Sequence, residues 1–315
     1  MTQTSAPSSR GVTIDKTHAK KVVGEIFSDY LANKKLFTYV RRSDAPQTKH
    51  CPEDIQKGSL KHAQWLFFAA MTDRREVSER VYAAHKQLWG KYESLLYTRP
   101  LLPLITTATD IVSFLIEEGI GMPDTSSKSW VACSSTLFGE LRGNPTKLYE
   151  AGSIDAIVAQ KDGAWHLPGF GPKLLSLLAL FYHEVDLIQL PKDAFPVDVH
   201  VQRFALSTGI VTTKEKISST ALEKILRPLL STICHEEDWP ILEVAHALWF
   251  LGNRLCTGCS RNSESAFFCP AYAACKGPVN TWGYFKKGAW DQGDRYPRGG
   301  DRPFGISENT PLFDS

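Results

Sequence analysis

The chain lacks an apolar run long enough to cross a membrane. A bilayer-spanning helix needs about 20 consecutive apolar residues. The longest apolar run here covers only residues 174–182 and is interrupted by Ser176. Residues 1–11 are polar and do not have the charged-then-apolar order of a secretory signal. We therefore expect no membrane partner and a cytoplasmic protein, nucleoid-associated if its source is a bacterium or an archaeon.

A strong excess of charge is also missing. The 36 lysine and arginine residues nearly balance the 34 aspartate and glutamate residues, which leaves a net charge of +2. Such a charge permits binding to nucleic acid but does not argue for it. The content of 43% apolar and 22% charged residues is ordinary for a folded protein, and 315 residues suffice for one or two domains. We expect a monomer.

No stretch alternates apolar and polar residues for long enough to anchor a β-sheet. A helical period begins instead at Asp15, and further helical segments continue to Leu255, separated by breaks that contain glycine and proline. The sequence therefore predicts an all-α protein.

The most informative stretch is a turn rich in glycine and proline before an apolar helix, HLPGFGPK at residues 166–173. Gly169 and Gly171 permit a tight turn and a close approach of the backbone to another molecule. Pro172 suits the first turn of a helix. Free amides at the two glycines, together with the helix dipole, would form a phosphate site. The alternative is a simple turn between two helices.

Lys173 lies at the start of that predicted helix. The positive end of the helix dipole and partial burial both favour an uncharged amine there. Schiff-base chemistry at the C1′ atom of a sugar requires an uncharged amine. The alternative is a lysine that only touches a DNA phosphate.

Asp198 follows 25 residues later, in FPVDVHVQR at residues 195–203. Its place after Pro196 predicts a helix N-cap, and such a cap is commonly structural. In the functional alternative, the carboxylate stabilises positive charge on the sugar of a departing base, or it handles the proton of an attacking amine or water.

Four of the seven cysteines lie within twenty residues of one another. In a cytosolic chain such a group indicates a metal centre rather than disulfides. Four thiolates suit either zinc or a [4Fe–4S] cluster. Cys51 and Cys133 are expected to be ordinary thiols. The predicted ligands are Cys256, Cys259, Cys269 and Cys275.

The stretch LPGFGPK followed by PVDVHVQR resembles the signature of the endonuclease III-like DNA glycosylase superfamily, which is a helix-hairpin-helix with a Gly/Pro-rich loop and an aspartate. The resemblance covers residues 61–277 and implies two helical subdomains with a DNA groove between them. It implies a hairpin that grips DNA whose target base is flipped out. Lys173 matches the lysine of members that combine glycosylase with lyase activity, and Asp198 matches the general catalytic aspartate.

The resemblance also divides the chain into segments. We expect a disordered lead-in at 1–12 and an N-terminal helix and loop at 13–60 that pack with the C-terminal subdomain. A helical barrel subdomain with the hairpin follows at 61–195, then a subdomain with helices and the cysteine loop at 196–280, and a tail at 281–315. The expected DNA contacts are Gly169, Gly171, Pro172, Arg254 and Arg261.

Many members of that family carry a [4Fe–4S] cluster with a structural role directly after the last helix of this domain. The family spacing between ligands is six, two and five residues, and the spacing here is two, nine and five. Cys256, Cys269 and Cys275 match the family positions. Cys259 is expected as the fourth ligand, with Cys234 as its alternative, and zinc is the alternative metal.

Three departures from the family pattern concern the groove. The long interval between the lysine and the aspartate indicates an insertion around residues 184–192, and residues 162–165 extend the segment before the hairpin. Residues 67–73 resemble the opening of a family helix, with Ala70 in place of the glutamine that fills the gap left by a flipped base. Burial in the core is the main expectation for the large aromatic residues, and stacking on a flipped base is the alternative. The candidates for stacking are Trp65, Phe68, Trp130 and Trp165.

The sequence therefore predicts a base-excision DNA glycosylase with associated AP-lyase activity, which acts on damaged or modified duplex DNA. Two alternatives stay open. One is a non-catalytic DNA-binding or damage-sensing protein that retains only the hairpin and the cluster. The other is a monofunctional glycosylase in which Lys173 only contacts phosphate. The target base is not predicted, because the family's intercalating residue is replaced by Ala70.

Overall fold

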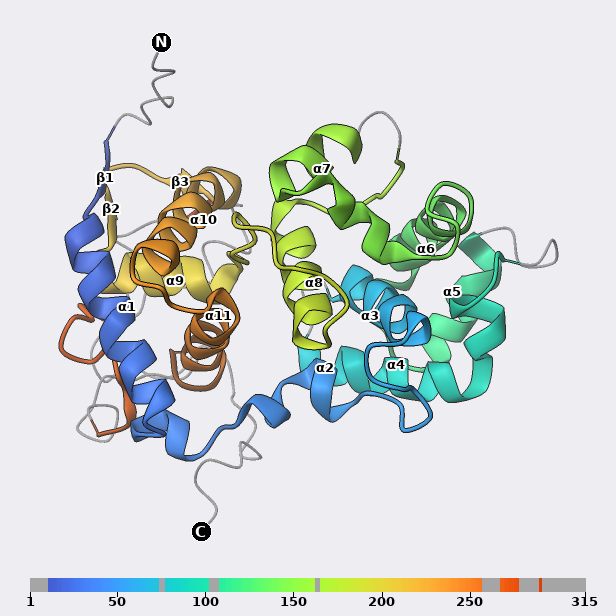
Figure 1. Ribbon diagram of the computed structural model, residues 1–315, viewed down its shortest axis with the longest axis horizontal. Coiled ribbons are helices and arrows are strands. Elements are labelled where there is room, and N and C mark those ends of the chain that lie inside the picture. Colours follow the sequence, from blue (N-terminus) through green and yellow to red (C-terminus); the bar gives the residue numbers. More distant parts are fainter. Residues whose placement is uncertain are drawn as a thin grey trace. The chain divides into compact units, whose positions relative to one another are not determined.

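The computed structural model describes residues 11–73, 77–101, 108–161, 165–256, 267–277 and 289–290. Within these residues the protein is mostly helical with a few short strands, so the predicted all-α class is confirmed (Figure 1). The chain forms two compact units. We call residues 1–41 with 197–315 the terminal unit, and residues 42–196 the central unit.

The central unit is helical throughout its described part. A short turn helix opens it, and longer helices surround α3 and α8. In chain order the elements are η2 (Arg42–Asp44), α2 (Pro46–Lys49), α3 (Leu60–Thr72), α4 (Ser78–Tyr92), η3 (Glu93–Tyr97), α5 (Ala108–Glu117), α6 (Pro123–Phe138), η4 (Pro145–Ala151), α7 (Ile154–Lys161) and α8 (Pro172–Glu184).

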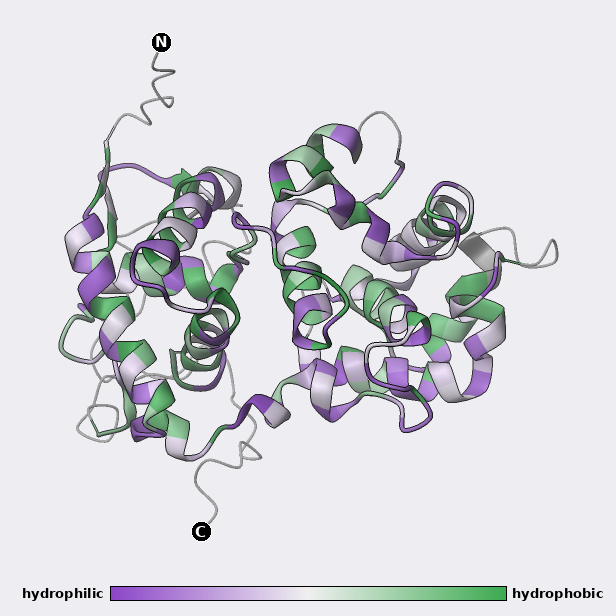
Figure 2. Ribbon diagram, in the orientation of Figure 1, coloured by the Kyte–Doolittle hydropathy of each residue, from purple (hydrophilic) through white to green (hydrophobic). Residues whose placement is uncertain are grey.

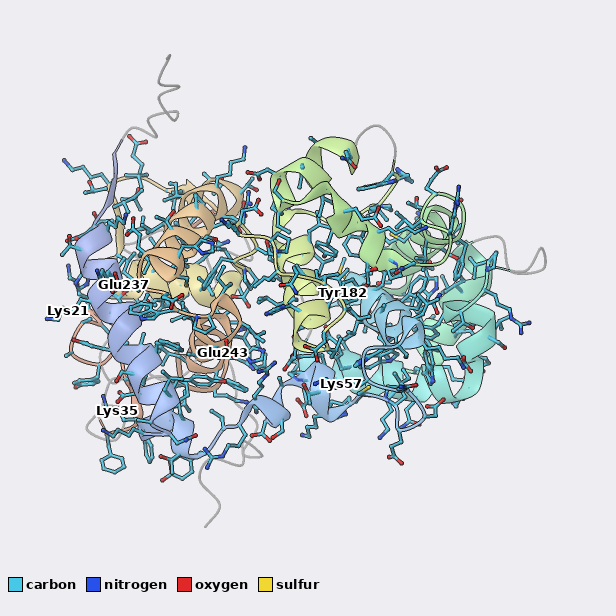
Figure 3. The ribbon with its side chains drawn as sticks, viewed as in Figure 1. Lys21, Lys35, Lys57, Tyr182, Glu237 and Glu243 are labelled. Atoms are coloured by element: carbon cyan, nitrogen blue, oxygen red, sulfur yellow. The ribbon has the colours of Figure 1, made fainter. Side chains whose placement is uncertain are left out.

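The helix α3 forms the middle of the core of the central unit. Ser59 caps it by accepting a hydrogen bond from the His62 amide at 3.2 Å. Every residue from His62 to Thr72 is buried, as expected for a helix that is apolar nearly all round and has other helices on several sides. The hydrophobic helix α8 packs against α3 (Figure 2). Tyr182 on α8 donates a hydrogen bond to the carbonyl of Ala63 at 2.9 Å, which joins the two helices (Figure 3).

The terminal unit is built from segments at both ends of the sequence. The antiparallel pair β1–β2 places Val12 opposite Thr213, and the pair β3–β4 places Ile217 opposite Trp290. The helix α1 packs against α11. The elements of this unit are β1 (Val12–Ile14), α1 (Lys16–Leu31), η1 (Lys35–Thr38), α9 (Val199–Thr208), β2 (Val211–Thr213), β3 (Ile217–Ser218), α10 (Ser219–Glu236), α11 (Ile241–Phe250), η5 (Leu251–Leu255) and β4 (Ala289–Trp290).

Two expected boundaries are corrected. Residues 42–60 were expected to pack with the C-terminal subdomain, but they belong to the central unit. Arg42 and Gln47 bind Glu184 at the end of α8, at 2.6 and 3.1 Å, and this buried carboxylate holds the segment there. The expected lead-in at 1–12 ends too late, because Val12 already belongs to β1. Residues 1–10 and most of the expected tail at 281–315 lie outside the described residues.

Candidate functional site

The turn before α8 is held firmly by its neighbours in the central unit. Phe170 is fully buried and stacks on Phe67, with ring centroids 4.9 Å apart and planes 19° from parallel. The Phe170 amide donates to the carbonyl of Leu167 at 3.1 Å. Thr136 on α6 donates its hydroxyl hydrogen bond to the carbonyl of His166 at 2.8 Å. The turn therefore has one fixed conformation, from which the chain enters α8.

The two glycines of this turn serve different purposes. Gly169 has a φ of +87°, the left-handed region that only glycine enters at little cost. Gly171 has a φ of −88° and a ψ of 179°, which any residue adopts. A Cβ atom built on Gly171 would have no atom within 4 Å. The fold therefore requires glycine at position 169 but not at position 171, where the bare backbone is open to close approach by another molecule.

The start of α8 has no side-chain cap. Gly171 is the N-cap residue and Pro172 occupies the first helical position. The first amides of a helix have no acceptor inside the helix, which leaves those of Lys173 and Leu174 to bind an anion. The prediction of a free amide at Gly171 is wrong, because this amide donates to the carbonyl of Gly169 at 3.0 Å. The open amides of the helix start are thus those of Lys173 and Leu174, two and three residues after Gly171.

Lys173 is half-buried in the first turn of α8. Among the described residues it makes no ion pair and no side-chain hydrogen bond, in contrast to Lys61 and Lys91 of the same unit, each of which binds a glutamate. No described carboxylate of the central unit therefore binds the amine of Lys173. A lysine that acts on a ligand needs an amine that is not held in this way.

Asp198 is the N-cap of α9, as predicted. Its Oδ1 atom accepts hydrogen bonds from the amides of His200 and Val201, both at 2.9 Å. In the part of the chain that the structure describes, its Oδ2 atom accepts no hydrogen bond. One oxygen therefore fixes the side chain, and the other is available to a ligand. Asp198 belongs to the terminal unit and Lys173 to the central unit, so the structure places each of them within its own unit only.

The first turn of α9 lies tightly against η5. A Cβ atom on Gly252 would come within 2.5 Å of the Cβ atom of His200, so glycine is required for this approach. Arg203 is buried and donates from Nη2 to the carbonyl of Gly252 at 2.6 Å, and the same atom lies 3.3 Å from Nδ1 of His200. The element η5 is a π-helical turn, a rare conformation that often occurs at functional sites.

Of the two arginines expected to bind DNA, only Arg254 lies among the described residues. Arg254 lies in η5 and is half-buried, and its Nε atom is buried with no hydrogen-bond partner among the described residues. A buried donor of this kind normally has an acceptor. Arg261 lies outside the described residues.

Three of the four predicted metal ligands are described. Cys269 is buried, and Cys256 and Cys275 are half-buried. The amide of Gly277 points to Sγ of Cys275 at 3.4 Å, a hydrogen bond that suits a metal-bound thiolate. The described residues contain no group of three or more His, Cys, Asp or Glu side chains that would hold a metal. Cys259 lies outside the described residues, so this finding does not test the full set of four.

The other three described cysteines lie in surroundings that bury their thiols wholly or in part. Burial raises the pKa of the Cys234 thiol, on α10, to about 12. Burial and the nearby carboxylate of Asp54 raise the pKa of Cys51 to about 11. Both thiols therefore carry a proton in the metal-free chain. Cys133 is buried against the carbonyl of Pro168.

Cys51 and His62 form a pair that does not act as a nucleophile and base. Sγ of Cys51 lies 3.6 Å from Nε2 of His62. The amide of Gly58 donates to Nδ1 of the same ring at 3.3 Å, which places the ring hydrogen on Nε2. Burial lowers the pKa of His62 to about 4. The Nε2 atom that faces the thiol therefore has no lone pair to receive its proton, and the lone pair of Nδ1 already accepts from Gly58.

The aromatic candidates for stacking on a flipped base are mostly core residues. Trp65, Phe68 and Trp130 are fully buried, and Phe68 stacks on Trp130 with centroids 4.6 Å apart. The expectation of core burial is therefore confirmed for these three, whereas Trp165 is half-buried. Residues 67–73 close α3 instead of opening a helix, with Asp73 as its C-cap.

Ala70 is also buried inside α3. It therefore does not lie where an intercalating residue would act.

Sequence reasoning missed a contact that orients the helix before the hairpin turn. Asp193 accepts hydrogen bonds from the amides of Ile154 at 2.9 Å and Asp155 at 3.1 Å, and Ser153 accepts one from the amide of Ala156 at 3.1 Å. The start of α7 is thus fully capped. Asp193 comes from the segment after α8, and no local pattern signals a cap that is supplied by a residue 38 or 39 positions away.

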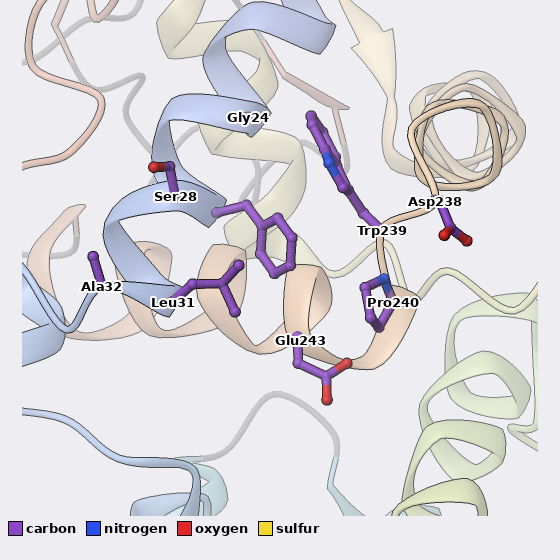
Figure 4. Close-up of a pocket in the computed structure, with 9 residues that line it drawn as sticks. Gly24, Ser28, Leu31, Ala32, Asp238, Trp239, Pro240 and Glu243 are labelled. Carbon is purple, nitrogen blue, oxygen red and sulfur yellow. The ribbon is translucent and has the colours of Figure 1, made fainter.

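A shallow pocket of about 900 Å³ opens elsewhere in the terminal unit, between α1 and the turn that joins α10 to α11 (Figure 4). Its apolar lining comes mainly from Phe27, Leu31 and Trp239. Asp198 does not line it. This pocket is therefore separate from the residues to which the sequence assigns chemistry.

Comparisons with known proteins give no family for this chain. No family model matches it, and no curated protein matches it. None of the helices in the described stretches is both long enough and apolar enough to span a membrane.

Proposed function

We propose that the protein is a DNA glycosylase with associated AP-lyase activity. The observation that carries the proposal is the start of α8. The fold does not require glycine at position 171, yet glycine leaves the backbone open there, next to the half-buried residue Lys173. The order of the two sequence motifs supports it, because the same order occurs in the endonuclease III-like superfamily. The spare Oδ2 atom of Asp198 adds a carboxylate that is free to act.

In this proposal the start of α8 binds the DNA backbone. A phosphate oxygen accepts hydrogen bonds from the amides of Lys173 and Leu174, which the helix dipole reinforces. A side chain at position 171 would obstruct that approach, and glycine avoids the obstruction. Such contacts fix the position of the DNA without reading its sequence.

Lys173 and Asp198 then carry the chemistry. The amine of Lys173 attacks C1′ of the sugar, and the bond from C1′ to the base breaks, so that the base leaves with the bonding electrons and takes up a proton from water. Asp198 is the proposed acid–base group, and its carboxylate would stabilise positive charge on the sugar. Opening of the sugar ring gives an imine. Loss of a proton from C2′ then expels the 3′ phosphate and nicks the strand.

The cysteines are proposed to hold a [4Fe–4S] cluster, with zinc as the alternative. Cys256, Cys269 and Cys275 would be ligands together with Cys259, and the amide beside Cys275 Sγ fits a thiolate at that position. The cluster would supply a fixed connection between η5 and residues 267–277, and Arg254 would lie beside it. An anaerobic absorption spectrum tests the metal: a broad visible band supports iron–sulfur, and a colourless protein that contains zinc contradicts it.

The experiment that tests the function is a panel of duplex oligonucleotides, each with one modified base. Glycosylase activity releases the base, and heat or alkali then reveals the abasic site as a strand break. Release from at least one duplex, abolished by Asp198→Asn, supports the proposal. No release from any duplex, at enzyme concentrations that saturate DNA binding, contradicts it.

One observation favours a second function, that of a non-catalytic DNA-binding protein. The hydrogen bonds from His200 and Val201 account for Asp198 as a structural cap without any chemistry. In that case DNA binding is sensitive to salt and survives Asp198→Asn, and no base is released. The monofunctional glycosylase differs from the main proposal in one respect only, since it releases the base but forms no covalent bond through Lys173.

A further inference from the structure

The helix α9, whose N-cap is Asp198, is short and is attached at both ends to one stretch of chain. It covers only Val199–Thr208. A helix of this length is marginal by itself and depends on contacts with its surroundings. The stretch to which it is attached runs from η5 to Gly277 and carries the predicted metal ligands, and we call residues 251–277 the cysteine segment.

The first attachment joins the beginning of the cysteine segment to the first half of α9. Arg203 donates to the carbonyl of Gly252 at 2.6 Å, and its Nη2 atom also lies 3.3 Å from the His200 ring. The missing side chain of Gly252 lets the backbone of His200 approach. The amide of that same His200 is one of the two that hold Asp198 Oδ1. Gly252 is thus connected to the carboxylate of Asp198 through Arg203 and His200.

The second attachment joins the end of the cysteine segment to the last turn of α9. The amide of Lys276, directly after Cys275, donates to the carbonyl of Ser207 at 2.9 Å. The Lys276 amine lies over Gly209, 3.3 Å from the place that a Cβ atom there would take. Gly209 ends the helix with a φ of +81°. A residue next to a predicted ligand therefore satisfies one of the last carbonyls of α9.

We propose that Arg203 and the Lys276 amide are positioning groups, through which the cysteine segment holds α9 and thereby sets the geometry of Asp198. The catalytic part of this inference rests on the proposed function, and the structural part does not. Loss of either attachment removes one of the contacts that hold that end of α9, beside the bond from His18 to the carbonyl of Thr208 at the last turn and the packing of α9 against α10 and α11. Fraying of the first turn withdraws the amides of His200 and Val201, and Asp198 then leaves its fixed orientation.

Amide hydrogen exchange tests the structural part, because exchange reports local opening of a helix whether or not the protein is an enzyme. Arg203→Met removes the first attachment, and Arg203→Lys restores a donor. Lys276→Pro removes the amide of the second attachment, and Lys276→Ala is its matched control, since it keeps the amide and shortens the side chain. Arg227→Met is the control for general loss of stability, because it breaks the buried pair with Glu223 on α10.

We expect exchange in residues 199–208 to accelerate by about tenfold or more in Arg203→Met and Lys276→Pro. Arg203→Lys should recover part of the protection, and Lys276→Ala should behave as the wild type. Unchanged exchange of α9 in both Arg203→Met and Lys276→Pro overturns the inference.

A kinetic arm tests the link to Asp198 on a duplex from which the wild type releases a base. Arg203→Met should lower the rate at saturating DNA by about tenfold and leave the DNA affinity within about threefold of the wild type. Arg203→Lys should rescue part of the rate, and Arg227→Met should leave it unchanged. An equal loss of rate in Arg227→Met overturns the positioning role. If the wild type releases no base at all, the proposed function fails, and the exchange results alone decide whether the attachments hold α9.

Discussion

The two helices that carry the proposed chemistry begin in opposite ways. The start of α8 has a glycine N-cap and leaves its first amides open. The start of α9 is closed by Asp198, whose Oδ1 atom takes up two amides. An open start attracts an anion, whereas a closed start presents a carboxylate. In the proposed function, the open start would bind DNA in the central unit and the closed start would present an acid–base group in the terminal unit.

The largest expected effect concerns the closed start. Asparagine caps a helix as well as aspartate does, so Asp198→Asn retains the cap and removes only the charge. We expect base release to slow by a factor on the order of 10³ with little change in stability. Single-turnover base release together with thermal unfolding measures both quantities.

Asp15→Asn is the matched control for this prediction. Asp15 caps α1 in the same unit by accepting from the His18 amide at 2.8 Å. The control should leave base release unchanged. A slow Asp198→Asn variant that has also lost its fold, or an equally slow Asp15→Asn variant, would argue for a purely structural aspartate.

A buried histidine in the interior of the central unit predicts that the stability of the protein depends on pH. Burial lowers the pKa of His85 in the central unit to about 3, from an ordinary value of 6.5. Its ring lies between the Thr72 hydroxyl at 2.7 Å and the Tyr97 hydroxyl at 2.8 Å. The unfolded chain takes up the proton below pH 6.5 and the folded chain does not, so stability is full above pH 6.5 and falls as the pH drops toward 3.

The expected loss is about 1.4 kcal/mol per pH unit from this histidine, or about 2 kcal/mol at pH 5. Urea unfolding followed by amide exchange of α3 and α4 measures it. His85→Gln should flatten the dependence, although it lowers the stability at every pH. A dependence that is equally steep in His85→Gln assigns the effect to another group.

A smaller effect is expected when the open start is closed. Gly171→Asp places a capping carboxylate on α8 at a position with room for a side chain and with an ordinary φ. We expect the helix to gain stability and the protein to lose about tenfold in DNA affinity, because the carboxylate occupies the amides and repels phosphate. Fluorescence anisotropy with labelled duplex at several salt concentrations measures the loss. Affinity that is equal to that of the wild type would exclude this helix start as a phosphate site.

The smallest effect separates the two glycines of the turn. Gly169→Ala forces a side chain into a left-handed conformation and should cost about 1 kcal/mol of unfolding free energy. Gly171→Ala should be neutral in stability and should weaken only DNA binding. Chemical denaturation measures the free energy of unfolding of the two variants, and the comparison of these two values tests the prediction. Equal losses of stability would mean that both glycines serve the fold.

Local features of this protein were predictable from the sequence. Asp198 was predicted as an N-cap because the cap depends only on the residues next to it, and the helical class followed from the apolar period. The turn at residues 166–173 was also predicted. Within it, the bond from the Gly171 amide to the Gly169 carbonyl was not, because it depends on the dihedral angles of a three-residue turn.

Features that depend on distant parts of the chain were not predictable. Core burial was expected for Trp65, Phe68 and Trp130, but their partners were not predicted: Trp65 packs on Tyr82 of α4, and Phe68 stacks on Trp130 of α6. Residues 42–60 join the central unit because of Glu184, more than a hundred positions away. Sequence periodicity carries no information on such pairings.

The most direct test of the central claim is borohydride trapping on duplex DNA with one abasic site. The lyase forms an imine through Lys173, and reduction converts it to a stable protein–DNA adduct. We expect an adduct from the wild type and from Lys147→Gln, which alters another half-buried lysine of the central unit, and none from Lys173→Gln. An absence of adduct from the wild type, under conditions that trap a known lyase, or an undiminished adduct from Lys173→Gln, would contradict the account.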